Sequence, residues 1–340
     1  MPLPLIPLIL GGIGAATAAT GIGKGIKAAV DNSDANDYNR KANENINSAK
    51  DALEASRKAS NIALETLGKK KLYVLDKTIS NFVTTFEELK NVQLEESIGL
   101  EELNKFKLDN QSINDLKEMS EYVSSILGGT VTGALGGALA GFGAYSAAMT
   151  FGAASTGTAI GTLSGAAATN ATLAFLGGGA LGTSAFALGM AGGTMVLGGL
   201  VAGPALAIMG FIIGAKASEN LDKAKSNYAE SNKIAEELQT AFVLCNGIRR
   251  RSNMFERLLI RLDVILVPLI LEMRKIISEK GKDWSNFSSD DKKQIAAAAS
   301  ITKAIKTVLD TPILTEDGKL TDESAQIASE TKQIIEAYGN

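Results

Sequence analysis

The residue types that carry most enzyme chemistry are scarce in this chain of 340 residues. It contains no histidine, which removes the commonest general base and the commonest zinc ligand. Its one cysteine, Cys245, cannot form an internal disulfide, and its apolar neighbours indicate a small buried hydrophobe rather than a catalytic thiol. Triad-type nucleophilic catalysis is therefore not expected.

Phosphate-binding and metal-binding patterns are missing as well. The glycine-rich segment 21–25 lacks the G-x-x-x-x-G-K-[ST] frame, and the glycine run 177–179 has no lysine near it. Paired carboxylates such as Glu87-Glu88 lie beside the apolar seam of a helix, where solvated side chains are the simpler interpretation. No acidic cluster has the spacing of metal ligands. The sequence predicts a protein that is not an enzyme and that uses no metal or cofactor.

Charge divides the chain into four parts. The 34 basic and 37 acidic residues give a net charge of −3, which predicts no nucleic-acid partner. The basic run Arg249-Arg250-Arg251 is more typical of a solvated helix end than of a headgroup-binding patch. We expect an N-terminal hydrophobic segment (1–30), amphipathic coiled-coil helices (31–121), an uncharged Gly/Ala-rich membrane region (122–215) and a C-terminal helical bundle (216–340).

The polar flanks carry the spacing of a coiled coil, and nothing in the chain alternates with the period of a β-strand. A weaker repeat precedes Gly68, which is a candidate helix stop. Apolar residues recur in steps of three and four, which predicts an all-α fold with a buried bundle seam rather than a partner-binding face. The predicted seam consists of Leu72, Leu75, Ile79, Phe82, Phe86, Leu89, Leu221, Tyr228, Leu238 and Phe242.

These matched stripes predict that the helices of 31–121 and 216–280 pack on each other as a long hairpin with the uncharged region at its tip. A richer helix is expected at about 249–279, kinked near Pro268, and its apolar run of eight residues is too short to cross a bilayer. Two more helices are expected at about 289–309 and 321–337. Between them, Asp317-Gly318 predicts a small turn or hairpin.

The uncharged region is long enough for several membrane crossings. Its 94 residues would extend about 140 Å as a helix, and a bilayer core is about 30 Å thick. It holds 23 of the 35 glycines, each costing about 1 kcal/mol in a soluble helix, whereas small residues four apart let membrane helices approach closely. The predicted glycine-zipper positions are Gly129, Gly133, Gly137, Gly141, Gly157, Gly161, Gly165, Gly189, Gly193, Gly199 and Gly203.

Much of this region is Ala, Gly, Ser and Thr, which partition only weakly into lipid. That composition suits a protein that folds in water with the block sheltered and then inserts, as pore-forming colicin domains and two-state α-helical toxins do. Residues 1–23 carry no charged side chain, and the first lysine follows the apolar run rather than preceding it. We expect a retained segment that inserts or packs on the central region; a cleaved signal is the alternative.

Segments 166–179 and 197–205, together with 247–251 and 310–318, resemble a family of mostly uncharacterised bacterial Gly/Ala-rich membrane proteins, sometimes labelled chemotaxis-like. The general plan is also similar to that of α-helical pore-forming toxins and of apolipoprotein L, without a shared residue motif. The resemblance implies a bacterial membrane protein and supplies no catalytic residue.

These observations together favour a membrane-inserting, oligomerising α-helical protein that forms a pore or disrupts a membrane, as a toxin-like or defence effector. Its expected partners are a lipid bilayer, further copies of the chain on insertion, and a protein bound through the coiled-coil helices. It is expected to be membrane-associated, and soluble in the cytoplasm or after release before it inserts. The alternative function is a resident membrane scaffold whose coiled-coil flanks recruit partners.

Overall fold

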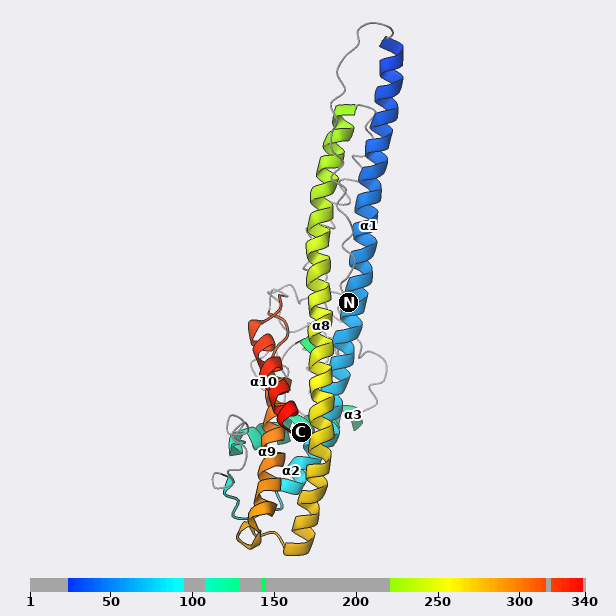
Figure 1. Cartoon of the computed structure of the whole chain (residues 1–340). Coiled ribbons are helices and arrows are strands. Elements are labelled where there is room, and N and C mark those ends of the chain that lie inside the picture. The colour runs from blue at the N-terminus through cyan, green and yellow to red at the C-terminus, as the bar shows by residue number, and fades with distance from the viewer. Residues whose placement is uncertain (1–23, 95–107, 129–141, 145–220, 316–318, 339–340) are drawn as a thin grey trace.

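The computed structural model describes residues 24–94, 108–128, 142–144, 221–315 and 319–338 (Figure 1). These residues are mostly helical, and they contain no β-strand beyond two isolated bridges. The predicted all-α class is therefore confirmed for the described part of the chain. Within that part, no helix has an apolar stretch long enough to cross a bilayer.

Two long helices form the body of the molecule. The first is α1 (Lys24–Tyr73), which continues through the π-helix η1 (Val74–Ile79) into α2 (Ser80–Phe86). The second is α8 (Leu221–Lys280). Figure 1 shows that both begin at the same end of the molecule and descend side by side.

Hydrogen bonds between the two helices establish that they run parallel. Asn45 Nδ2 donates to Asn232 Oδ1 at 3.1 Å. Further along both helices, Ser60 Oγ donates to the Cys245 carbonyl at 2.6 Å, and near their ends Arg274 Nη2 donates to Asn81 Oδ1 at 3.0 Å. The residue numbers of both partners rise together, as parallel packing requires.

The predicted hairpin is therefore wrong in direction, although its two halves do pack on each other. Lys70 pairs with Asp263, so the segment Leu72–Leu89 lies opposite the later part of α8 rather than opposite Leu221–Phe242. Spacing in steps of three and four reads the same in both directions along a helix, so it does not distinguish parallel from antiparallel partners.

The parallel arrangement also separates the described helices that flank the uncharged region, whose ends the predicted hairpin would have joined. Ser124, near the end of α3 (Asn110–Gly128), donates to Asp76 Oδ1 at 2.6 Å. Near the start of α8, Asn227 donates to Asn39 at 3.2 Å. At 1.5 Å per residue, Asp76 and Asn39 lie about 55 Å apart along α1.

The core follows the facing stripes of the long helices. Six of the predicted seam residues are buried, and the other four, Leu72, Leu221, Tyr228 and Phe242, are half-buried. In α8 the stripe passes through Ser231, Ile234 and Ala241, the last of which is one residue before the expected Phe242. The predicted stripe is shifted because it includes only apolar residues, whereas the polar Ser231 is fully buried.

Shorter helices pack around the lower half of the α1–α8 pair (Figure 1). They are α3, α9 (Ser289–Asp310) and α10 (Asp322–Tyr338). The last two agree with the predicted ranges to within one residue. At the start of α9, Ser288 and Asp291 form a reciprocal capping box. An isolated bridge joins Leu314 to Leu320, and the expected turn residues at 316–318 lie outside the described residues.

Two expected interruptions of the long helices are absent. The segment 249–279 is not a separate helix, because α8 continues from Leu221 to Lys280 with Pro268 inside it. Pro268 is exposed, so the carbonyl that loses its helical partner faces water. Gly68 does not end α1, since the helix runs on to Tyr73 and buries this glycine.

Candidate functional site

A short piece of the uncharged region packs against the helical body. Residues 142–144 form one buried helical turn beside α1. A Cβ atom on Gly143 would lie 2.0 Å from the Leu64 carbonyl oxygen and 3.2 Å from the Gly68 amide nitrogen. The backbone of this turn therefore touches the backbone of α1, and only glycine fits at position 143.

Hydrogen bonds to two carbonyls hold this turn in place. The backbone amides of Ile313 and Leu314 both donate to the Ala144 carbonyl, at 2.8 Å and 3.2 Å. From α1, Lys71 Nζ donates to the Phe142 carbonyl at 3.1 Å. Backbone carbonyls that are buried away from water need such partners. We call residues 142–144 with Lys71, Ile313 and Leu314 the docking site.

Lys71 is the unusual member of the docking site because its side chain is completely buried. Its Nζ lies 5.5 Å from the centroid of the Phe142 ring, which covers it. Burial lowers the pKa of Lys71 from 10.5 to about 7, and the nearby charge of Asp310 acts in the opposite direction. Burial thus disfavours the charged form of this amine relative to an exposed lysine.

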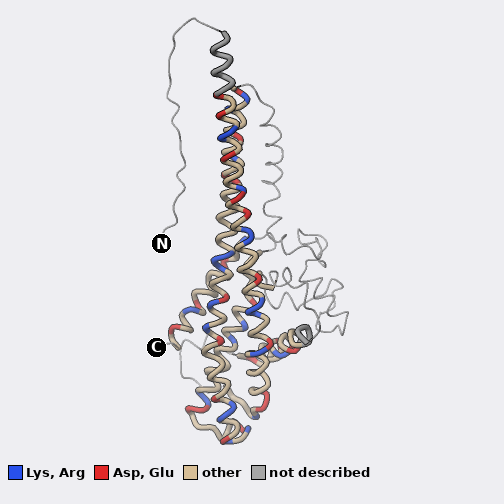
Figure 2. The backbone as a smooth tube through the Cα atoms, turned by 90° about the vertical axis from the view of Figure 1, so that its right-hand side faces the viewer, with Lys and Arg blue, Asp and Glu red and all other residues tan. Residues whose placement is uncertain are grey.

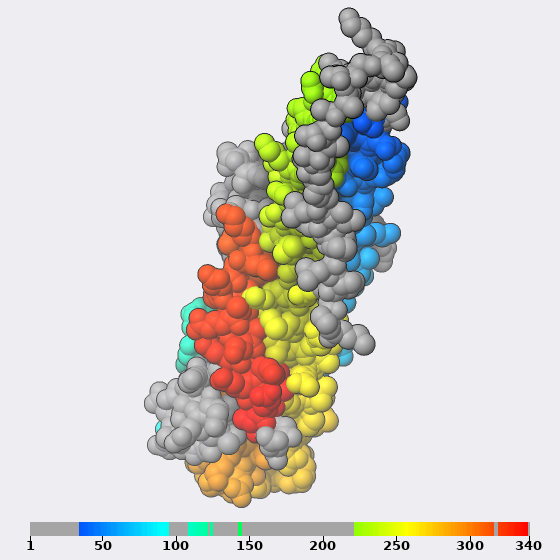
Figure 3. Space-filling model, turned by 45° about the horizontal axis from the view of Figure 1, so that its top comes forward, coloured from blue at the N-terminus to red at the C-terminus, as the bar shows by residue number. Residues whose placement is uncertain are grey.

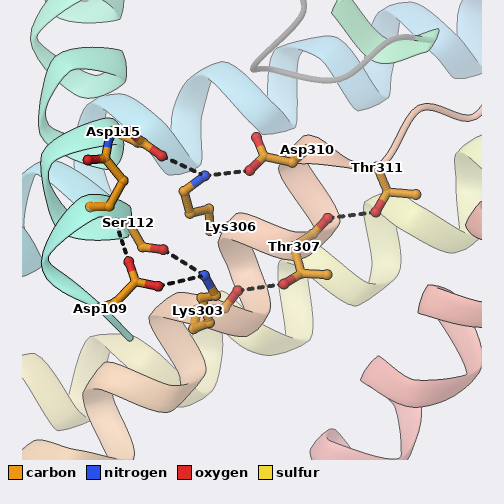
Figure 4. Close-up of polar contacts among 9 residues, drawn as sticks. Asp109, Ser112, Asp115, Lys303, Lys306, Thr307, Asp310 and Thr311 are labelled. Atoms are coloured by element: carbon orange, nitrogen blue, oxygen red, sulfur yellow. Dashed lines mark hydrogen bonds and ion pairs between the residues drawn. The ribbon is translucent and has the colours of Figure 1, made fainter. Parts of the chain in front are cut away.

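Asp310 connects the docking site to α9 and α3 (Figure 4). Its Oδ2 lies 2.6 Å from Lys306 Nζ, which lies 3.3 Å from Asp115 Oδ2. Burial alone would lower the pKa of Lys306, but the hydrogen bonds and charges of Asp310 and Asp115 outweigh it and raise that pKa. Asp310 Oδ1 is buried and has no hydrogen-bond partner, so one carboxylate oxygen of the cluster is left unsatisfied.

A second contact fixes the start of α3 on α9. The Ser112 amide donates to Asp109 Oδ1 at 2.6 Å, and this bond is the main reason that the pKa of Asp109 is lowered. Lys303 Nζ donates to Ser112 Oγ at 2.6 Å and lies 3.9 Å from Asp109 (Figure 4). The helix that leads into the uncharged region is thus anchored at its first turn.

The arrangement fastens a chain segment to the body through backbone hydrogen bonds and a buried amine. Lys71 is enclosed, so a substrate cannot reach its amine. Among the described residues, no group of three or more Cys, Asp and Glu side chains converges as a metal site would require. The contacts that the structure shows attach residues 142–144 to the body beside a buried amine.

The sequence did not single out Lys71, Asp310, Lys306 or Asp115. One signal in the sequence was a lysine at a position of the apolar stripe. Position 71 lies between Leu67 and Val74 on the buried stripe, where the spacing predicts an apolar residue. The predicted zipper glycines, from Gly129 to Gly203, all lie outside the described residues.

Comparisons of the chain with protein-family models, with curated proteins and with solved structures gave no match. In the described residues, the fold and the site define an all-α protein in which a buried lysine of α1 bonds to part of an uncharged region.

Proposed function

We propose that this chain is a membrane-inserting α-helical protein that oligomerises and forms a pore or disrupts a membrane. In the proposed mechanism, the water-soluble form keeps the uncharged region 122–215 against the helical body, and insertion releases it. The observation that carries this proposal is the docking site, where a piece of that region is held on the body by a buried lysine, by backbone hydrogen bonds and by the packing of Phe142 and Ala144 in the core.

The remaining features of the proposal rest on sequence spacing. The facing stripes of α1 and α8 would act as a coiled-coil seam that keeps the body folded, and the glycines four residues apart would pack inserted helices into an oligomer. The end of α3 and the start of α8, which flank the region, lie about 55 Å apart, and this separation adds support. The region could detach from the body while α1 and α8 stay packed on each other.

The test is dye release from liposomes, combined with crosslinking to measure oligomer size. We expect the full chain to release dye and to form oligomers. Gly137→Leu should abolish both because the larger side chain separates packed helix backbones, while Leu139→Ile, off the glycine line, should leave both unchanged. The far-ultraviolet helical signal should be the same in all three proteins. Unchanged leakage and oligomers in Gly137→Leu would contradict the zipper and the pore.

The second candidate is a resident membrane scaffold, and the upper part of the α1–α8 pair favours it. This part extends beyond α9 and α10 (Figure 1), and charged residues follow it along its length (Figure 2). Exposed ion pairs such as Arg40 with Asp37 and Glu44 keep this surface polar, as a recruiting arm would need. Carbonate extraction of host membranes separates the two candidates, because a scaffold stays in the pellet and an inducible inserter is largely soluble beforehand.

A further inference from the structure

The face of α8 that points away from the core carries an exposed apolar stripe. Ile260, Val264, Val267 and Leu271 are 41%, 68%, 44% and 58% exposed. Their steps of four, three and four residues place them along one line of the helix. Figure 3 shows the surface of α8 open beside α10 over this part of its length. We call these four residues the α8 stripe.

Tyr73 of α1 extends this apolar surface onto the neighbouring helix. Lys70 Nζ lies 2.7 Å from Asp263 Oδ2 and 4.7 Å from the centroid of the Tyr73 ring. Since Asp263 precedes Val264, this contact places Tyr73 level with the α8 stripe. The Tyr73 side chain is 53% exposed. The apolar surface therefore spans both long helices and includes an aromatic residue.

The charged residues beside the α8 stripe are mostly basic. Arg257, Arg261 and Lys275 are exposed on the turns that flank it. No ion pair joins Arg257 or Arg261 to a carboxylate among the described residues. Of the nearby acids, Asp263 pairs with Lys70 and Glu272 lies 3.4 Å from Lys275, while the half-buried Glu256 beside Arg257 offsets one positive charge. The surface thus combines exposed aliphatic side chains with a net positive charge from Arg257, Arg261 and Arg274.

We propose that the α8 stripe, with Tyr73 and these basic residues, is a docking surface for an anionic phospholipid bilayer. Aliphatic side chains enter the boundary between headgroups and acyl chains, while arginine and lysine bind anionic headgroups. Tyrosine prefers the same boundary. This inference rests on the proposed function, because it names the class of lipid that the soluble form first contacts.

A second copy of the chain is the other occupant to consider, and the charges argue against it. Arg257 lies three residues before the α8 stripe and Arg274 three residues after it, on the same line. A parallel pair of α8 helices would place Arg257 against its own copy. An antiparallel pair would place Glu256 and Arg257 against Arg274 and Lys275, which leaves a net positive charge at both ends of the contact. The stripe is also short, about 17 Å, whereas a stable coiled coil needs three or four heptads. Charge complementarity therefore selects anionic lipid.

The experiment is flotation of the full-length protein with vesicles of phosphatidylcholine alone or of phosphatidylcholine mixed with phosphatidylglycerol. We expect binding only to the vesicles with phosphatidylglycerol, weakening as salt is added. The double variant Arg257→Gln/Arg261→Gln should bind about 30-fold more weakly, at about 1 kcal/mol for each basic residue near an anionic surface. Val264→Glu should also lose binding, since it removes apolar contact and adds a repelled charge.

Two matched variants control for the substitutions themselves. Val243 is 61% exposed on the same helix but lies outside the α8 stripe, so Val243→Glu should bind like the unaltered protein. Lys58→Gln, which neutralises an exposed lysine of α1 outside this surface, should do the same. All of these positions are exposed, and equal helical signals by circular dichroism would exclude misfolding as a cause.

Equal binding to neutral vesicles, or unchanged binding of both variants, would overturn the proposal. So would a lipid-free dimer that Val264→Glu dissolves, because it would assign the stripe to a second copy. Dye release separates this inference from the proposed function. Selective binding without release would support docking and contradict the pore, whereas release without selectivity for anionic vesicles would contradict docking alone.

Discussion

Gly143→Ala should undock the piece of the uncharged region that the structure places on α1. The added Cβ would lie 2.0 Å from the Leu64 carbonyl oxygen, inside the distance that real Cβ atoms keep. Leu64 is a buried residue in the middle of α1, so its backbone cannot yield as a flexible side chain could. Residues 142–144 must therefore move away from the helix.

The size of the effect follows from what this movement breaks. Three hydrogen bonds are lost, two to the Ala144 carbonyl and one from Lys71 to the Phe142 carbonyl. At about 1 kcal/mol each they contribute roughly 3 kcal/mol, and exposing the buried Phe142 ring adds about 2 kcal/mol. We expect the free energy of unfolding, measured in urea, to fall by about 3 to 5 kcal/mol.

A second readout reports the docking directly. Undocking removes the cover of Lys71, so an amine-acetylating reagent should modify this lysine rapidly in Gly143→Ala and slowly in the unaltered protein, as mass spectrometry would show. Gly247→Ala is the matched control, because its Cβ would meet only the Cδ1 atom of Leu320, at 2.9 Å, and that side chain can rotate away. Equal stability and equal protection of Lys71 in the two variants would refute the docking argument.

Two further predictions concern the same half of the molecule. Because folding lowers the pKa of Lys71 from 10.5 to about 7, the unfolded chain binds more protons between these values, and stability should rise as pH increases from 7 to 10.5. At about 1.4 kcal/mol per pKa unit, Lys71→Met should be more stable than the unaltered protein at pH 7 by a few kcal/mol. Its stability should also lose this part of the pH dependence. Parallel curves of stability against pH for the two proteins would contradict this. Ser288→Ala should lower the free energy of unfolding by about 1 kcal/mol through loss of the α9 cap, whereas Ser289→Ala, one residue inside the helix, should change it little in the same urea experiment.

The parts of the fold that depend on local sequence could be predicted. The bounds of α9 and α10 follow from apolar spacing and, for α9, from Ser288 and Asp291 at its start. Local signals do not determine how far a helix runs when its neighbours stabilise it. Gly68 is a weak helix former, but α1 continues through it because Gly143 packs there and because the facing helix extends alongside.

The docking site could be predicted only in part, since it depends on tertiary contacts. A lysine at a stripe position is visible in the sequence, but its burial, its lowered pKa and its bond to Phe142 arise from residues 71 positions later in the chain. Asp310 comes from another helix again. The parallel direction of α1 and α8 has the same origin, because it depends on matched polar pairs such as Asn45 with Asn232 that apolar spacing ignores.

The parallel pairing also sets the order of events during synthesis. Asn45 can form its hydrogen bond only after Asn232, 187 residues later in the chain, has been synthesised. At about 5 to 20 residues per second, a ribosome needs roughly 10 to 40 seconds to make that stretch. Throughout this time the side of α1 that packs on α8 lacks that partner, and the uncharged region emerges before α8 exists. Nascent chains should therefore depend on a chaperone or a nearby bilayer, and the rate of translation should affect how much protein reaches the folded state.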